Sequence, residues 1–73
     1  MSEAIYAYVW TISTEVWEYA HGWQIKPFLI AEAQKKAGTT GGEWTVHARE
    51  DLTPLFDGLA PVYRVVVEGR VSE

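Results

Sequence analysis

The chain has 73 residues, a net charge of −4 at pH 7 and no cysteine. This length suffices for one domain over residues 1–73, and the lack of cysteine excludes disulfides, thiol nucleophiles and Cys-based metal sites while fitting a cytoplasmic location. The acidic balance argues against non-specific binding to DNA, and the apolar runs are far too short to span a membrane.

The first predicted element is a strand over Ala4–Ile12, which is rich in β-branched and aromatic residues and lacks glycine and proline. Side chains alternate across a strand, so the segment has two faces: Tyr6, Tyr8, Trp10 and Ile12 on one, and Ile5, Ala7, Val9 and Thr11 on the other. Both faces are largely apolar, and such a strand is expected to be covered on both sides.

The segment Thr14–Lys26 is compatible with two structures. It fits a short helix with Thr14 as its N-cap. It also fits a β-hairpin in which Val16–Ala20 and Trp23–Lys26 flank a two-residue turn at His21-Gly22. Tryptophan and tyrosine favour strands, and glycine tolerates the positive φ that such turns need, so the hairpin is the favoured interpretation.

A helix is predicted over Pro27–Ala37. Pro27 suits the first turn, where its missing N–H costs nothing, and Gly38 supplies the stop. The helix has one apolar stripe, made of Leu29, Ile30, Ala33 and Ala37.

Two more strands are predicted after the helix, over Glu43–Arg49 and Val62–Val71, with a turn or single helical turn at Thr53–Asp57 between them. Their inward-facing residues are Trp44, Val46, Ala48, Tyr63, Val65, Val67 and Val71. The whole order is strand, possible hairpin, helix, strand, strand. It predicts an α+β fold in which a small antiparallel sheet of three to five strands packs on one main helix.

One helix can cover only one face of this sheet. If Ile5, Ala7 and Val9 lie under the helix, the other face carries an aromatic row with polar neighbours. Such a surface is typical of an interaction site, and we predict that it consists of Tyr6, Tyr8, Trp10, His47, Arg49, Arg64 and Arg70. The alternative is that the hairpin or the 50–61 loop folds over this face and buries it.

These features predict a non-enzymatic interaction or accessory module that forms a homodimer or binds another protein through the aromatic face. An alternative function is binding of single-stranded nucleic acid on the same aromatic row. A third is a small enzyme with His47 or His21 as its base. Glu18 and His21 have an E-x-x-H spacing, but a single copy of it does not make a metal site. We therefore predict neither a catalytic residue nor a metal or other cofactor.

Overall fold

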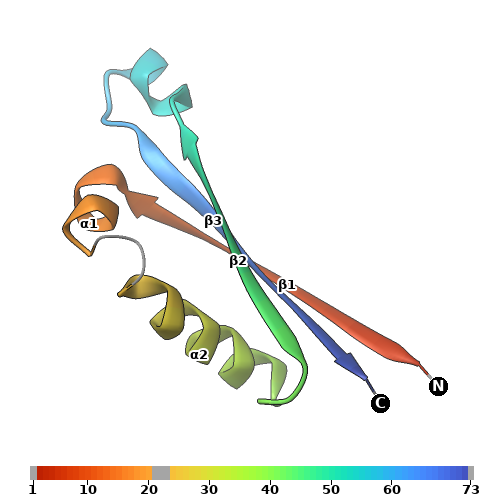
Figure 1. The fold of residues 1–73 in the computed structure, drawn as a ribbon. Coiled ribbons are helices and arrows are strands. Elements are labelled where there is room, and N and C mark those ends of the chain that lie inside the picture. The colour runs from red at the N-terminus through yellow and green to blue at the C-terminus, as the bar shows by residue number, and fades with distance from the viewer. Residues whose placement is uncertain (1, 21–23, 73) are drawn as a thin grey trace.

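The computed structural model describes residues 2–20 and 24–72. In chain order its elements are β1 (Glu3–Ser13), α1 (Thr14–Tyr19), α2 (Ile25–Ala37), β2 (Glu43–Asp51), the 3₁₀ helix η1 (Thr53–Asp57) and β3 (Val62–Ser72). Within the described residues, β3 is the central strand and pairs antiparallel with β1 on one side and β2 on the other. Both α-helices lie on one side of this sheet (Figure 1), which confirms the predicted α+β fold.

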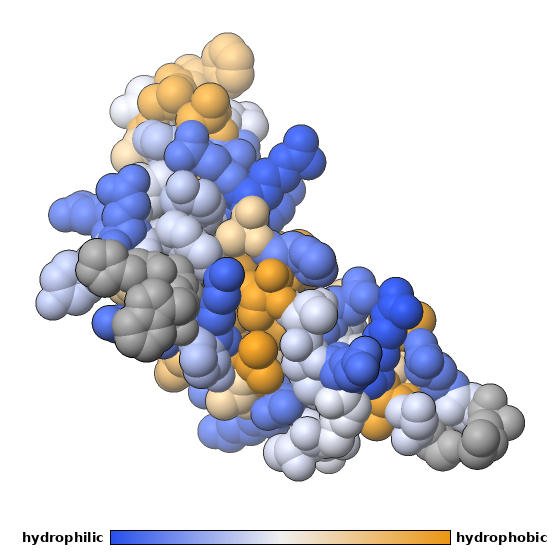
Figure 2. All heavy atoms as spheres, in the orientation of Figure 1, coloured by the Kyte–Doolittle hydropathy of each residue, from blue (hydrophilic) through white to orange (hydrophobic). Residues whose placement is uncertain are grey.

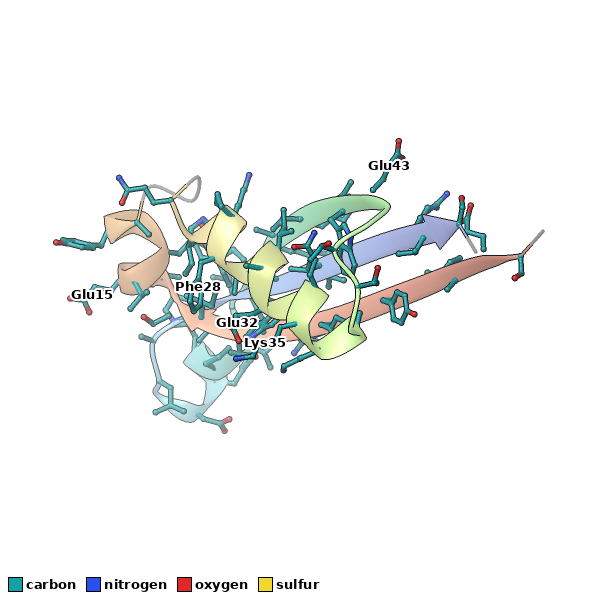
Figure 3. The ribbon with its side chains drawn as sticks, turned by 90° about the horizontal axis from the view of Figure 1, so that it is seen from below. Glu15, Phe28, Glu32, Lys35 and Glu43 are labelled. Carbon is teal, nitrogen blue, oxygen red and sulfur yellow. The ribbon has the colours of Figure 1, made fainter. Side chains whose placement is uncertain are left out.

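Helix α2 begins two residues before the predicted start and ends where predicted. Pro27 still falls in the first turn, where backbone N–H groups have no partner within the helix. Gly38 closes the helix with a φ of 76°, a conformation that favours glycine, and its N–H donates to the Gln34 carbonyl oxygen. Leu29 and Ala33 are buried against the sheet, so the predicted apolar stripe is confirmed. Seen from below, α2 runs obliquely in front of the strands (Figure 3).

The hairpin predicted for the segment after β1 is wrong over the described residues, because the chain forms helix α1 there. The N-cap is Ser13 and not Thr14. Its hydroxyl oxygen accepts a hydrogen bond from the Val16 N–H at 3.2 Å and so satisfies a donor that the helix leaves free. The predicted turn at His21-Gly22 lies outside the described residues.

The core lies between α2 and the central strand. Its fully buried residues are Leu29, Ala33, Val65 and Val67. Partly buried aromatic side chains extend this layer toward both ends of the sheet. At one end Trp17 of α1 stacks on Tyr63, with ring centroids 5.2 Å apart, and this contact gives the short helix a reason to pack on the sheet.

The predicted faces of β1 are exchanged in the structure. Tyr8 pairs with Val67 and Trp10 pairs with Val65, so Tyr6, Tyr8 and Trp10 lie on the helix side of the sheet. The reason is burial, because aromatic rings remove more apolar surface from water than the smaller side chains of the other set. A shift of one residue exchanges the two faces of a strand, and β1 has no polar face to prevent it.

The molecule is elongated, with principal extents of 48, 23 and 15 Å. Its radius of gyration is 14.0 Å, whereas a compact domain of this length has about 11 Å. The shape follows from the architecture: two long edge strands flank β3, and the helices form a layer on only one side. The opposite face of the sheet has no layer of the described residues above it.

Candidate interaction surface

The face of the sheet that points away from the helices is here called the open face. It includes residues from all three strands: Ile5, Ala7, Val9 and Thr11 of β1, Arg64, Val66, Glu68 and Arg70 of β3, and Thr45, His47, Arg49 and Asp51 of β2. The strand register aligns them in rows. One row runs from Val9 through Val66 to His47, and the next from Thr11 through Arg64 to Arg49.

Apolar residues gather along the β1 side of the open face. We call Ile5, Ala7, Val9 and Val66 the apolar strip. Ile5 is 62% exposed and Val9 is 60% exposed, although both belong to residue types that are normally buried. A contiguous apolar strip bordered by polar groups is typical of a surface that binds a partner.

The other half of the open face is polar. Arg49 and Arg64 are directly opposite each other on β2 and β3. The Arg64 Nη2 lies 3.3 Å from Asp51 Oδ2, while Asp51 Oδ1 accepts a hydrogen bond from the Thr53 N–H at 3.0 Å. These groups, together with Glu50, line a hollow of about 390 Å³ at the end of the sheet.

The charge state of this hollow follows from Asp51. Hydrogen bonds from the Thr53 hydroxyl and backbone N–H, and then the positive charges of Arg64 and Arg49, lower the pKa of the Asp51 carboxyl below its ordinary value. Asp51 therefore remains ionised at neutral pH and pairs with Arg64. Arg49 has no ion pair within residues 2–20 and 24–72, so it is a cationic group at the rim of the apolar strip.

The remaining predicted site residues of β2 and β3 also lie on the open face. His47 is exposed, and its Nε2 lies 3.4 Å from Thr45 Oγ1. Arg70 is exposed too, and its Nε lies 3.4 Å from Glu68 Oε1. The structure thus brings together His47, Arg49, Arg64 and Arg70 on one face, as the alternation of these strands predicts.

The predicted aromatic row does not lie with them. Tyr6 stacks on Trp44 with ring centroids 6.2 Å apart, and Tyr8 lies against Trp10 at 6.4 Å. The Lys36 ammonium of α2 lies 5.9 Å from the Tyr8 ring and 5.2 Å from the Trp10 ring. These cation–π contacts attach helix α2 to strand β1 at two partly buried rings. The open face therefore offers no aromatic platform for stacked bases.

A second exposed apolar group was missed by the sequence reasoning. We call Leu52, Leu55, Phe56 and Leu59 the hydrophobic tip. Leu55 and Phe56 lie within η1 and the other two lie on either side of it, in the β2–β3 connection, and Phe56 is 91% exposed. Figure 2 shows hydrophobic atoms gathered at this upper end, and in Figure 1 the connection extends beyond the sheet. The 50–61 loop does not cover Tyr8 and Trp10. These side chains are instead partly buried beneath helix α2, so the prediction of an exposed aromatic row is wrong. The sequence feature that could have revealed the hydrophobic tip is the presence of four large apolar residues within the eight positions 52–59.

The structure describes only one of the two residues with the E-x-x-H spacing. Glu18 lies on α1, while His21 lies outside the described residues. The described side chains bring together no group of three or more His, Asp or Glu residues that could hold a metal ion. His47 does not line the hollow near Asp51. No described helix is long and apolar enough to cross a membrane.

The chain was compared with models of known protein families, with curated proteins and with solved structures, and none of them matches.

Proposed function

We propose that this protein is an interaction module that binds a protein chain, a second copy of itself or another protein, through the apolar strip of its open face. The observation that carries the proposal is an imbalance of apolar burial. Among the described residues, four hydrophobic side chains are buried, whereas nine large ones are more than half exposed, and two of these nine, Ile5 and Val9, lie on the apolar strip. A partner that covers the strip would provide the burial that the helices supply on the other face.

The chemistry of the open face favours a protein partner over a nucleic acid. Its apolar members are aliphatic, so they offer no ring on which a base could stack. Asp51 neutralises Arg64, Glu68 neutralises Arg70, and the whole chain carries a charge of −4. In the proposed complex, Arg49 and His47 border the strip and provide polar contacts at its rim. A chain without cysteine suits a reducing compartment, and we place the module in the cytoplasm.

Site-specific photo-crosslinking tests this proposal in cells that make the protein. Val9, at the centre of the apolar strip, is replaced by p-benzoylphenylalanine, which an exposed position accommodates. Irradiation is expected to give one covalent protein adduct of discrete mass, because a partner seated on the strip lies within reach of the probe. Mass spectrometry then identifies the adduct as a second copy or as another protein.

The matched control carries the same probe at Lys35, an exposed residue of α2 on the helix side of the sheet. Its adduct yield is expected to be several-fold lower. The proposal is wrong if irradiation yields no protein adduct at position 9, or if both positions yield the same adducts equally.

A further inference from the structure

Strand β1 has an unusual outer edge. It is eleven residues long, and in the described structure it pairs with a strand only on its β3 side. From Ala4 to Ser13 it contains no charged residue, no proline and no glycine. Proteins normally protect a long edge strand with such residues, because its free N–H and C=O groups can pair with another chain.

The opposite edge of the same sheet has this protection. Strand β2 carries Glu43, Arg49, Glu50 and Asp51. Figure 3 shows Glu43 pointing away from the body of the molecule at the start of the strand. The two edges differ in charge although both belong to one small sheet. Pairing with another strand is therefore blocked at β2 and left open at β1.

The sequence of β1 is nearly symmetric about Tyr8. The residues directly before and after Tyr8, Ala7 and Val9, are both aliphatic. The residues two positions away on either side, Tyr6 and Trp10, are both aromatic. The residues three positions away on either side, Ile5 and Thr11, are both β-branched. Two copies of this strand running antiparallel would place matching residue types opposite each other. A twofold pairing about Tyr8 would therefore put aromatic residues opposite aromatic ones and aliphatic residues opposite aliphatic ones.

The exposed area agrees with one missing partner. The solvent-accessible surface is 5273 Å², whereas a compact monomer of 8.3 kDa has about 4,600 Å². The excess of about 700 Å² is close to the roughly 800 Å² that each partner buries in a stable interface.

We propose that two copies pair through the outer edges of β1, antiparallel and centred on Tyr8, so that two three-stranded sheets join into one of six strands. This inference goes beyond the proposed function, because edge pairing uses the backbone edge of β1 and leaves the apolar strip on the open face uncovered. Ala7 of each copy then lies opposite Val9 of the other, and Tyr6 opposite Trp10, where cross-strand aromatic pairs add stability. The twofold axis is normal to the sheet and places both α2 helices on the same side.

Cysteine crosslinking tests this register directly, because the chain has no cysteine of its own. Single-cysteine variants Ala7→Cys and Val9→Cys are prepared alone and mixed in equal amounts under mild oxidation. Residues directly opposite each other in neighbouring strands lie within the Cα distance that a disulfide allows. The mixture is expected to give a 7–9 linked heterodimer at several-fold higher yield than either variant alone.

Val66→Cys is the matched control, because Val66 is on the open face directly beside Val9 but on the central strand. Edge pairing separates the two copies of Val66 by three strand spacings, about 14 Å, which is too far for a disulfide. Circular dichroism checks that every variant keeps the fold of the parent protein.

The outcomes separate this inference from the proposed function. Efficient linkage of Val66→Cys to itself would overturn edge pairing but support the proposed function, with the second copy lying face to face on the strip. Dominant linkage of Ala7→Cys or Val9→Cys to itself would overturn the register centred on Tyr8. If no variant links, the second copy is the wrong partner, and photo-crosslinking at position 9 decides whether another protein binds there.

Discussion

Gly69 shows how a single missing side chain determines the packing at one end of the sheet. The Trp44 ring lies over this glycine, and a Cβ added there would come within 2.6 Å of three of its ring atoms. In this position the Trp44 Nε1–H donates to the Gly41 carbonyl oxygen at 2.8 Å, and the ring stacks on Tyr6. Because Gly69 has no side chain, Trp44 of β2 can lie over the central strand and stack on Tyr6 of β1.

Replacing Gly69 with alanine is expected to destabilise the protein by about 1–3 kcal/mol, the usual cost of forcing extra volume into a packed site. Trp44 must move, and its hydrogen bond and ring stacking are then weakened. Urea unfolding measures the change. The control is Gly41→Ala, where the added Cβ meets only an ordinary contact at 3.8 Å and stability should barely change. Equal stabilities of the Gly69→Ala variant and the parent would contradict this role.

At the scale of elements, local signals determined which segments could be predicted. Leu29 and Ala33 share one face of a helix that ends at Gly38, and each of these features lies within a few residues of the others. Strand β2 alternates polar and apolar residues up to Arg49, and β3 does so apart from Val62 and Val66. For this reason His47, Arg49, Arg64 and Arg70 were correctly predicted to lie on one face. This part of the candidate surface could be deduced without any knowledge of tertiary contacts.

Two elements could not be predicted in this way. Strand β1 is apolar on both faces, so its own pattern does not indicate which side meets the helix. The choice depends on how much area Tyr8 and Trp10 bury beneath α2. In α1, the strand propensity of Trp17 and Tyr19 is outweighed by the contact of Trp17 with Tyr63, a residue far away in the sequence. Both errors come from contacts that only the assembled fold creates.

The cap of α1 can be tested by substituting Ser13. This helix has only six residues and cannot be stable in isolation, so it depends on its cap and on Trp17 packing. Ser13→Ala removes the oxygen that accepts from the Val16 N–H, and we expect a loss of about 1 kcal/mol in the free energy of unfolding. Ser13→Asp keeps an acceptor and should restore the stability. If the alanine variant is as stable as the parent in urea, the cap does not stabilise α1.

At the scale of the whole molecule, the small core and the large exposed surface both support the proposal of a partner subunit. Domains below about 80 residues gain little stability from one core and commonly need disulfides, a metal or a partner subunit. This chain has no cysteine, and its described residues form no metal cluster. The uncharged edge of β1 and the apolar strip are the surfaces at which the proposed partner would supply further burial.

If the folded state is a dimer, its thermal stability must depend on concentration. A roughly 100-fold dilution removes about 2.7 kcal/mol from the dimer by mass action, or about 1.4 kcal/mol for each chain. For a domain of this size the melting temperature should then fall by about 5–10 °C. The melting temperature is measured by differential scanning calorimetry at high protein concentration and by tryptophan fluorescence at low protein concentration. Ala7→Lys is the control, because a lysine on the β1 edge blocks pairing and should make the melting temperature independent of concentration. A parent protein that melts at the same temperature before and after dilution would be a stable monomer, and its exposed β1 edge would then be tolerated without a second copy.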